Sequence, residues 1–376
     1  LLSAARVARR DGTISWAKAS RLFSNHRRMA HNTYEEMMHV HMMELGKSGL
    51  KVSKIALGTI TWGSAIQEPE YYRGLLDACL DQGINYVDTA PVYGPAVSEE
   101  LLGKALKGIR DRFILQTKCG LNWRNTEGSF EYLRNGKNVY RNLSAASIRQ
   151  DLEDSLRRLQ TDYIDVYVTH RQSLTVPREE TIGELLRMKE QGKIRAIGVS
   201  NVTAQEVDEY QKITDVAVMQ QKYSIVVPKF GDVLFPVCKK YGITYQTWGM
   251  FEGGALVSRA ALDSITGPDD PNSKKSVLLH PAMKPYASSL FDALESVARK
   301  HGCSVANVVL QYTSTKFDNM NLLIGSSKVR TIEDTCKALE VKLDDEDIAR
   351  IDEPARRFLE NYSPEFDRAY PVNQEQ

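Results

Sequence analysis

The chain has few cysteines and almost no net charge, and each shortage excludes a class of protein. Its five cysteines are scattered through 376 residues, odd in number and never spaced as CxxC. They predict neither a disulfide framework nor a zinc site, and they suit a reduced, cytoplasmic protein. With 49 basic and 48 acidic residues, the chain carries a formal net charge of +1, which predicts no binding to nucleic acid or to a membrane surface.

Long apolar runs and several catalytic motifs are also missing. From residue 44 onward, no stretch approaches the roughly 18 apolar residues of a membrane span. The chain has no GxSxG elbow, no GxxxxGK loop and no GxGxxG fingerprint. No cluster of histidine, cysteine and carboxylate side chains has the spacing of metal ligands, so we expect no metal site.

Residues 1–34 differ in composition from the rest of the chain. They contain seven arginine and lysine residues against a single acid, Asp11, and no apolar run follows as in a secretory signal. This composition resembles an organelle transit peptide, which would place the protein in a mitochondrion or plastid. The other interpretation is a disordered or appended extension of a cytoplasmic protein. On either interpretation, residues 1–43 are predicted to form an N-terminal extension.

Between residues 44 and 352, strand-like and helix-like stretches alternate eight times. A hairpin turning at residues 47–49 is expected to lead into the first strand. We expect strands at residues 54–57, 84–89, 112–118, 163–169, 194–199, 217–220, 243–247 and 321–324. We expect helices at residues 68–82, 98–107, 144–159, 181–191, 203–212, 232–241, 289–300 and 331–339. This alternation predicts a parallel sheet, and eight units predict its closure into a (β/α)8 TIM barrel.

Two connections that follow predicted strands are longer than a barrel needs. Residues 121–143 follow the third strand, and residues 249–288 follow the seventh. Loops in these positions lie on the face where α/β barrels carry their active sites, so we expect both to cover that face. Residues 353–376 are charged, and we predict a C-terminal tail there, with a final helix followed by a loose end.

Four polar residues lie at or just beyond the ends of three successive predicted strands. Asp88 lies near the end of the second strand and Tyr93 just beyond it, Lys118 ends the third strand, and His170 follows the fourth. Barrels of this class collect catalytic groups at these strand ends. Each residue alone has an ordinary explanation, as a turn cap, a rim aromatic, a surface cation or a hydrogen-bonded polar group. Together these four residues, the tetrad, predict a site that donates a proton to a carbonyl oxygen.

The chemistry of the tetrad fits that task. A carbonyl that accepts hydride develops negative charge on its oxygen, and a donor at that point lowers the barrier. The ammonium of Lys118 is expected to favour the phenolate of Tyr93 and to lower the pKa of this tyrosine from about 10. Asp88 would orient Lys118 and balance its charge, while His170 would hydrogen-bond the substrate oxygen.

Several motifs occur in an order and spacing typical of one known family. They are GLKVSKIALGT, INYVDTAPVYG, SLRRLQTDYIDVYVTH, GKIRAIGVSN and IGSSKVRTIEDT. With these motifs, residues 44 to 352 resemble the aldo-keto reductase superfamily, and within it the bacterial general-stress reductases and the voltage-gated potassium-channel β-subunits. The resemblance implies an NAD(P)H-dependent carbonyl reductase that reduces an aldehyde, ketone or sugar, or oxidises an alcohol in reverse, with Tyr93 as the general acid.

The resemblance also implies a nicotinamide cofactor that extends across the mouth of the barrel. Ser200, Asn201 and Gln220 would hold its carboxamide, and Trp248 would stack on its ring. The other contacts that the resemblance implies are Gly58, Thr59, Gly325, Ser326, Ser327, Lys328, Arg330 and Asp334. Residues of these types also serve as helix caps or rim packing, so each contact depends on the resemblance.

Lys328 and Arg330 carry the prediction of cofactor preference. They precede a helix expected near residue 331, where backbone amides and two cations would bind the 2′-phosphate of NADPH. We therefore expect NADP(H) to be preferred over NAD(H), the alternative being that both cations are solvated. The arginine position usual in the family aligns with Thr331 and its asparagine with Thr335, so the pattern differs here.

An aromatic rim is predicted at the mouth, formed by Trp62, Trp123, Tyr223 and Phe251. Such a rim suits aldehydes, ketones and sugars alike, so the substrate stays open, as does an oligomeric state. A second class of function is a non-catalytic or redox-sensing nicotinamide-binding subunit, like the channel β-subunits. Those subunits have asparagine where this chain has His170, so the histidine favours turnover.

Overall fold

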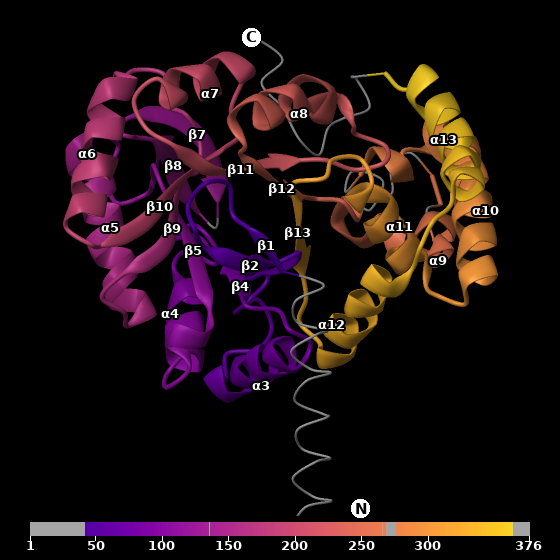
Figure 1. The fold of residues 1–376 in the computed structure, drawn as a ribbon, viewed down its shortest axis with the longest axis horizontal. Coiled ribbons are helices and arrows are strands. Elements are labelled where there is room, and N and C mark those ends of the chain that lie inside the picture. Colours follow the sequence, from indigo (N-terminus) through magenta and orange to yellow (C-terminus); the bar gives the residue numbers. More distant parts are fainter. Residues whose placement is uncertain (1–41, 135, 265, 268–275, 364–376) are drawn as a thin grey trace, which may run out of the picture. The chain divides into compact units, whose positions relative to one another are not determined.

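Eight parallel strands close into a barrel in the computed structural model, which describes residues 42–134, 136–264, 266–267 and 276–363 (Figure 1). The ring follows the chain order and closes where the last strand pairs with the first. The strands are β3 (Ile55–Gly58), β4 (Tyr86–Asp88), β5 (Ile114–Cys119), β9 (Ile164–Thr169), β10 (Ile194–Ser200), β11 (Val216–Lys222), β12 (Thr244–Trp248) and β13 (Met320–Gly325). The predicted (β/α)8 TIM barrel is confirmed. The predictions for residues 1–41 and 364–376 lie outside the described residues.

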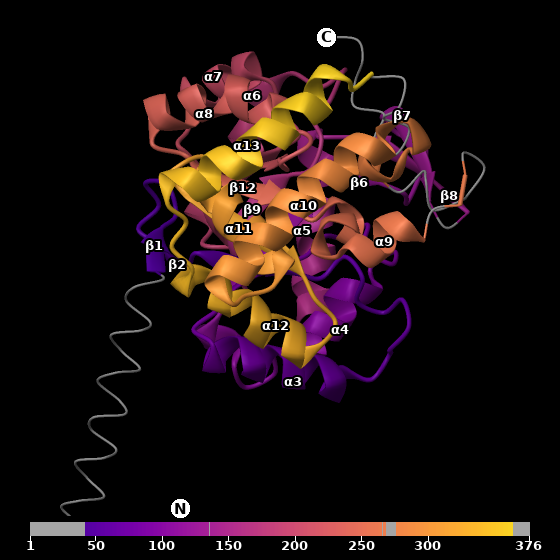
Figure 2. The same ribbon diagram turned by 90° about the vertical axis from the view of Figure 1, so that its right-hand side faces the viewer.

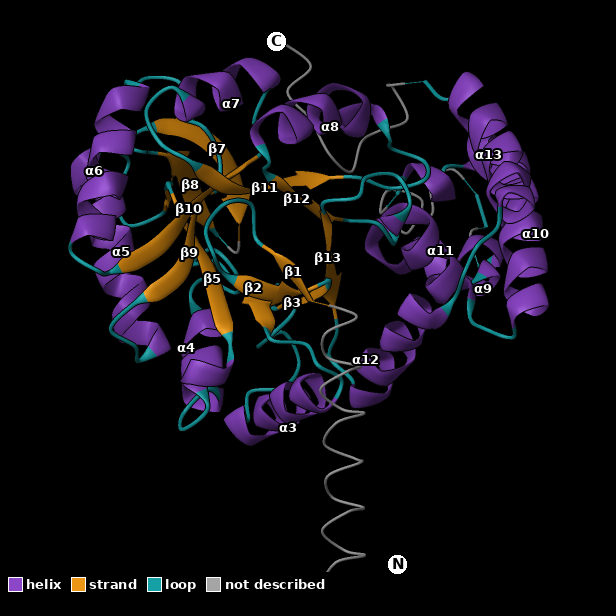
Figure 3. Ribbon diagram, viewed as in Figure 1, coloured by secondary structure: helices purple, strands orange, loops and turns teal. Residues whose placement is uncertain are grey.

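Helices surround this ring of strands, as Figure 2 and Figure 3 show from two sides. Those that follow the barrel strands are α3 (Pro69–Asp81), α4 (Val97–Ala105), α5 (Ala145–Leu159), α6 (Arg178–Glu190), α7 (Ala204–Gln211), α8 (Lys229–Tyr241), α10 (Lys284–His301) and α12 (Val329–Cys336). A 3-10 turn, η1 (Arg110–Arg112), precedes β5. Within the described residues, no helix is both long and apolar enough to span a membrane.

The start and end of α5 illustrate why these stretches become helices. Ser144 is its N-cap, and the Ser144 side chain accepts a hydrogen bond from the backbone N–H of Ser147, an otherwise unpaired donor of the first turn. Ile148 and Leu152, four residues apart, are fully buried on one face. The helix ends where Gln160 adopts a left-handed φ of 53°. These bounds agree with the helix predicted at residues 144–159.

A hairpin lies against the N-terminal ends of two barrel strands. β1 (Met42–Glu44) pairs with β2 (Lys51–Ser53), as predicted. Gly46, between them, has a φ of 56°, and its N–H donates to Thr244 Oγ1 at 2.8 Å. A Cβ on Gly46 would lie 2.3 Å from the carbonyl oxygen of Ala217, so only glycine fits there. The hairpin therefore covers the end of the barrel opposite to the strand ends that carry the tetrad.

The connection after β5 folds into a small antiparallel sheet. Its strands are β6 (Leu121–Asn122), β7 (Ser129–Arg134) and β8 (Lys137–Arg141), in the order β6-β8-β7. The prediction of a long loop at residues 121–143 was therefore wrong. The Asn-Gly pair at positions 135 and 136 is a strong sequence signal for a hairpin. Leu121 and Val139 pack with Val92 and Tyr93, so the sheet does cover the Tyr93 side of the mouth.

The connection after β12 also contains short regular elements. They are η2 (Glu252–Val257), α9 (Arg259–Asp263), η4 (Val277–Leu279) and η5 (Pro281–Met283). Leu256, Leu278 and Met283 from three of these elements are buried in one cluster with Leu290 of α10. Residues 265 and 268–275 of this predicted cover lie outside the described residues.

The C-terminal helices differ from the prediction. α11 (Val305–Ser314) was not foreseen, and η6 (Lys337–Glu340) follows α12. The last described helix, α13 (Asp345–Glu360), runs through Pro354 and crosses the boundary predicted between residues 352 and 353. Ala355 and Phe358, beyond that proline, are buried with Leu294 of α10, against which α13 packs (Figure 2). This burial offsets the hydrogen bond that proline cannot make, so the predicted start of the tail lies inside a helix.

Candidate active site

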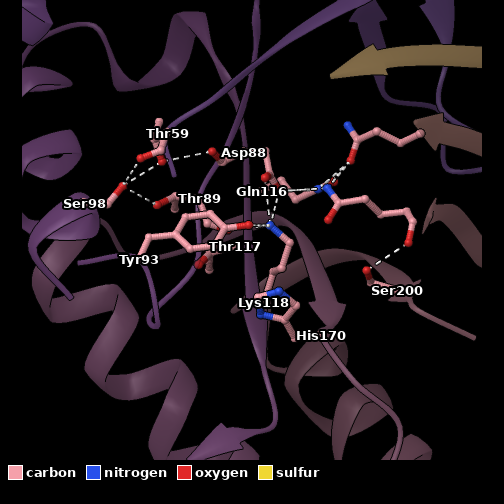
Figure 4. A network of polar contacts seen from close by, with 12 residues as sticks. Thr59, Asp88, Thr89, Tyr93, Ser98, Gln116, Thr117, Lys118, His170 and Ser200 are labelled. Carbon is pink, nitrogen blue, oxygen red and sulfur yellow. Dashed lines mark hydrogen bonds and ion pairs between the residues drawn. The ribbon is translucent and has the colours of Figure 1, made fainter. Parts of the chain in front are cut away.

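Three barrel strands bring the tetrad together at one end of the ring (Figure 4). Asp88 is the last residue of β4, Lys118 lies near the end of β5, and His170 follows β9. Tyr93 lies in the turn between β4 and α4. The ammonium of Lys118 lies 3.2 Å from Tyr93 Oη, and 2.6 and 2.8 Å from the carboxylate oxygens of Asp88. These contacts place a phenol and a carboxylate within hydrogen-bond reach of the same ammonium.

Lys118 and Asp88 form a buried ion pair, with side chains 0% and 1% exposed. The ammonium also donates to the backbone oxygen of Thr89 at 2.9 Å. Burial lowers the pKa of Lys118, but the charge of Asp88 and the hydrogen bonds to Asp88 and Tyr93 outweigh it, so that the pKa is raised. Lys118 is therefore a cation at neutral pH.

The phenol of Tyr93 keeps its proton. Burial raises the pKa of Tyr93 above its ordinary value, and the charge of Lys118 only partly offsets this effect. The expectation that Lys118 would lower this pKa was wrong in its net direction, because burying a phenolate costs more than the ammonium restores. A neutral phenol beside a cation is both a hydrogen-bond donor and a source of a proton.

His170 presents a neutral imidazole beside Tyr93. Burial, followed by the charges of Lys118, Arg171 and Arg134, holds the pKa of His170 well below its ordinary value. The rings of His170 and Tyr93 meet edge to face, with centroids 6.0 Å apart. A neutral imidazole can donate a hydrogen bond to a substrate oxygen without adding a second positive charge beside Lys118.

Thr59 supports the backbone of Asp88. The Thr59 hydroxyl donates to the backbone oxygen of Asp88 at 3.1 Å and accepts from Ser98 Oγ at 2.7 Å. Its N–H also donates to that Asp88 oxygen, and its carbonyl oxygen accepts from Ser98 Oγ at 2.9 Å. Every hydrogen-bonding group of Thr59 is thus engaged within the fold, and Gly58 beside it is buried. The contacts of these two residues with a cofactor stay predictions.

The ends of β10, β11 and β12 carry the residues predicted to face the nicotinamide. Asn201 has a left-handed φ of 53°, and its side chain donates to Ser200 Oγ and to the backbone oxygen of His170, both at 2.9 Å. Ser200 Oγ donates to the backbone oxygen of Gln220 at 2.9 Å. Trp248, at the end of β12, is partly exposed. These residues lie at the same ends of the strands as the tetrad.

Gln220 belongs to a chain of buried amides inside the barrel. We name Gln116, Gln220, Gln246 and Asn321 the amide relay; they come from β5, β11, β12 and β13. The Gln220 nitrogen donates to Asp88 Oδ1 at 3.2 Å and to Gln246 Oε1 at 2.6 Å, which uses both of its N–H groups. Among the described residues, none donates to Gln220 Oε1. This oxygen is an acceptor that fits the N–H of a nicotinamide carboxamide, so the site suits that group.

The loop after β13 presents two exposed cations. α12 begins at Val329, so Lys328 is its N-cap and Arg330 lies in its first turn, slightly earlier than the helix start predicted near residue 331. In the described part of the chain, no carboxylate lies within ion-pair distance of either cation. The Ser326 hydroxyl accepts from the Lys328 N–H at 3.2 Å and donates to the Lys328 oxygen at 3.0 Å. Exposed cations at a helix N-terminus fit a phosphate group.

Three further residues of this loop and helix were predicted to contact the cofactor. Gly325 and Ser327 are exposed, and the Ser327 backbone oxygen accepts from the Tyr71 phenol. Asp334 accepts a hydrogen bond from Ser304 Oγ at 3.0 Å, ahead of α11. The contacts of these three residues with a cofactor stay predictions.

The four residues predicted to form an aromatic rim divide into two pairs. Trp62 and Tyr223 are only 1% and 5% exposed, and Trp62 stacks on Tyr72 with ring centroids 4.3 Å apart. Both pack in the core, so the prediction that they line the mouth is not met. Trp123 and Phe251 are partly exposed and remain available to a substrate.

A small hollow beside the Tyr93 turn includes two cations that sequence analysis did not select. Its lining residues are Val92, Pro95, Trp123, Arg134, Lys137 and Val139. Arg134 ends β7 and Lys137 begins β8, and the charge of Arg134 acts on both Tyr93 and His170. The sequence alone does not place Arg134 near Tyr93, because it is the hairpin of β7 and β8 that brings Arg134 to the site.

Metal ions and thiols offer no alternative centre in the part of the chain that the structure describes. It contains no group of three or more histidine, cysteine, aspartate and glutamate residues placed to hold a metal ion. Cys79, Cys119 and Cys238 are buried free thiols, and burial raises the pKa of each. Thiolate chemistry is therefore disfavoured at these three positions.

Comparison with known proteins gives one consistent result. The model of the Aldo/keto reductase family matches residues 54–356. The NADH-specific methylglyoxal reductase of Escherichia coli (strain K12) is 32% identical over 324 residues, which cover 83% of this chain and 97% of that protein. The aldo-keto reductase YhdN of Bacillus subtilis (strain 168) is 32% identical over 276 residues, which cover 71% of this chain and 79% of that protein.

Solved structures resemble this fold as well. A glycerol dehydrogenase from Gluconobacter oxydans matches with a TM-score of 0.75 at 27% identity, covering 86% of this chain and 98% of that one. The holo form of an aldo-keto reductase from Bacillus halodurans matches with a TM-score of 0.64 at 27% identity, covering 87% and 99%. The segment matched by the family model contains the whole tetrad and the whole amide relay.

Proposed function

The chain belongs to the aldo/keto reductase family, and from this membership we propose that it is an NAD(P)H-dependent carbonyl reductase with Tyr93 as its proton donor. The observation that carries the proposal is the buried cluster in which Lys118 lies 3.2 Å from the Tyr93 phenol and pairs with Asp88. A neutral phenol held beside a cation suits an oxygen that gains negative charge. The nicotinamide cofactor, when bound, supplies the hydride.

Lys118 acts on the proton transfer through its charge. The ammonium lies against the phenol oxygen, so it stabilises the phenolate that remains once Tyr93 has given up its proton. Asp88 accepts hydrogen bonds from the ammonium with both carboxylate oxygens and balances its charge. Because the pair is buried, water screens this attraction little. The three residues therefore stabilise the charge that develops as the substrate is reduced.

His170 holds the substrate oxygen in this proposal. Its imidazole is neutral and lies edge to face with the Tyr93 ring, so the two donors lie side by side. A substrate oxygen between them would receive a hydrogen bond from each. This arrangement favours turnover over a purely redox-sensing role.

We propose NADP(H) as the preferred cofactor. Lys328 and Arg330 are exposed at the start of α12, and in the described part of the chain neither has a carboxylate partner, which supports a contact with the 2′-phosphate. The Escherichia coli relative is named as NADH-specific. The two cofactors therefore have to be compared directly on this chain.

The proposed substrates are small aldehydes, ketones or sugars. Two relatives are named for methylglyoxal and for glycerol, which are small oxygenated compounds. The hollow beside the Tyr93 turn is lined in part by Trp123, Arg134 and Lys137. The charges of Arg134 and Lys137 on the Tyr93 side of the mouth would favour a polar carbonyl over a long apolar one.

A panel of cofactors and carbonyls tests the proposal. The purified chain is mixed with NADPH or NADH and with methylglyoxal, glyceraldehyde or 4-nitrobenzaldehyde, and the nicotinamide absorbance is followed. Saturable oxidation of either cofactor that requires both protein and carbonyl supports a reductase. Cofactor binding without turnover of any carbonyl would support the redox-sensing alternative, and the absence of binding would contradict both.

A further inference from the structure

The amide relay connects the active site with the opposite end of the barrel. Gln116, Gln246 and Asn321 are fully buried, and Gln220 is 3% exposed. Branched apolar side chains usually fill the interior of such barrels. Buried amides cost free energy unless they are hydrogen-bonded, so four of them in contact indicate a role other than packing.

The direction of the relay is set at its far end. Asn321 Nδ2 lies 2.8 Å from the backbone oxygen of Ser53 and 3.2 Å from that of Lys54. Carbonyl oxygens only accept hydrogen bonds, so the nitrogen of Asn321, not its oxygen, must face them. Asn321 Oδ1 is then an acceptor, and it takes a hydrogen bond from Gln246 Nε2 at 2.8 Å.

The orientation of Gln246 determines the orientation of the next two amides, Gln220 and Gln116. Its nitrogen faces Asn321, so its oxygen accepts from Gln220 Nε2 at 2.6 Å and from Gln116 Nε2 at 2.7 Å. Both nitrogens also donate to Asp88 Oδ1, at 3.2 Å from Gln220 and 2.6 Å from Gln116. Reversing any one amide would set two donors or two acceptors against each other, so the orientation of all four is fixed together.

Both N–H groups of the Gln220 side chain are used within the relay, whereas its oxygen accepts no hydrogen bond from the described residues. We propose that Gln246 and Asn321 are positioning residues, which hold Gln220 so that its oxygen accepts the carboxamide N–H of the nicotinamide ring. This inference rests on the proposed function. Beyond that function, it specifies which atom of Gln220 faces the ring and which residues prevent the Gln220 amide from flipping.

Gln116 belongs to the same relay but makes no hydrogen bond with Gln220. Its oxygen accepts from the Tyr86 phenol, and its nitrogen donates to Asp88 and Gln246. It therefore supports Asp88 and not the group that faces the ring. This difference makes Gln116→Met a matched control for Gln246→Met, with the same chemical change in the same buried network.

The test compares the preferred cofactor with its 3-acetylpyridine analogue, in which a methyl group replaces the NH2 of the carboxamide. Wild type should bind the cofactor about five- to tenfold more tightly than the analogue, the value of one hydrogen bond. Gln246→Met should lose most of this ratio through weaker cofactor binding, because Gln220 is then free to turn. Asn321→Leu should act in the same direction, and Gln116→Met should keep the wild-type ratio.

Dissociation constants come from quenching of tryptophan fluorescence, and thermal melts show which variants are folded. An unchanged ratio in folded Gln246→Met, an equal loss in Gln116→Met, or a wild type that binds both ligands alike would overturn the inference. If Gln246→Met does not fold, Asn321→Leu and the wild-type ratio decide the question. A wild type that binds neither ligand would instead contradict the proposed function.

Discussion

Lys118 Nζ lies 3.2 Å from the phenol oxygen of Tyr93, and yet the pKa of that phenol is raised. Burial is the larger effect, so the ammonium does not ionise Tyr93 at rest. It lowers the free energy of the phenolate only once the proton is leaving, which is when catalysis needs it. The pair therefore keeps a proton that is ready for transfer.

Tyr93→Phe should abolish carbonyl reduction and leave cofactor binding nearly intact. It removes only the hydroxyl, and the phenyl ring keeps its packing with Leu121 and Val139. Loss of a general acid lowers turnover by roughly 10²–10⁴-fold. Turnover from the nicotinamide absorbance and binding from fluorescence quenching separate the two effects. A variant that retained more than about a tenth of wild-type turnover would exclude Tyr93 as the donor.

Lys118→Met should be comparably inactive and also less stable. Without the cation, Asp88 is a buried carboxylate whose remaining donors, among the described residues, are the amides of Gln116 and Gln220. Breaking a buried pair in this way costs about 3–5 kcal/mol, which urea unfolding would measure. Lys104→Met, at an exposed position of α4, is the matched control and should change stability by less than about 0.5 kcal/mol. Full activity in Lys118→Met would contradict the proposed site.

The reduction rate should be flat across neutral pH. Tyr93, with its pKa raised above about 10, stays protonated, and His170, with its pKa lowered below about 6.5, stays neutral. Turnover at saturating cofactor should therefore be constant between about pH 7 and 9 and fall only at higher pH. A fall in turnover centred near neutral pH would contradict these protonation states.

His170 should also make the fold sensitive to acid. Its folded pKa is lower than its unfolded pKa, so below about pH 6.5 the unfolded chain binds more protons, and stability falls as the pH drops through that value. Urea unfolding midpoints measured from pH 7 to 5 would show this, and His170→Gln should reduce the slope. Equal slopes in both proteins would assign the acid sensitivity to other groups.

Replacing both Lys328 and Arg330 with alanine should weaken NADPH far more than NADH, because only NADPH carries the phosphate. Two charge-assisted contacts at an exposed site predict a loss of roughly tenfold or more for NADPH. The preference should shrink with added salt. Lys342→Ala, also exposed, is the control. Equal losses for the two cofactors, or no preference in wild type, would leave these cations as solvated charges.

Gly46→Ala should destabilise the barrel from the end away from the chemistry. The new Cβ would meet the Ala217 carbonyl at 2.3 Å in a backbone with φ of 56°. Gly49→Ala is the matched control: φ there is also positive, at 73°, but nothing lies within 4 Å of the added carbon. We expect about 1 kcal/mol from conformational strain at Gly49 and clearly more at Gly46, measured by urea unfolding.

The tetrad could be predicted because its signal is local. Asp88, Lys118 and His170 each lie at the end of an apolar run, and the closure of a barrel brings such ends together whatever the details of packing. The hairpin of β7 and β8 has an equally local signal in its Asn-Gly pair, so it too is predictable from the sequence.

The amide relay could not be predicted in the same way. Gln116 and Gln246 are 130 positions apart, and their contact depends on the tilt and stagger of strands in the closed ring, which sequence patterns do not specify. The prediction that the pKa of Tyr93 is lowered was wrong for a related reason, because the net shift depends on how deeply the phenol is buried. The end of α13 depends likewise on a partner surface, α10, that receives Phe358 beyond Pro354.

Closure of the ring determines the order in which contacts can form during translation. The second neighbour of β3 is β13, which lies more than 260 positions later in the chain, so one edge of β3 stays unpaired until those residues have been made. Asn321, which orients the amide relay, lies on that last strand, and its acceptors Ser53 and Lys54 lie beside the first. A nascent chain can therefore form most of the barrel wall without the relay, and the orientation of Gln220 is fixed only once β13 has been made.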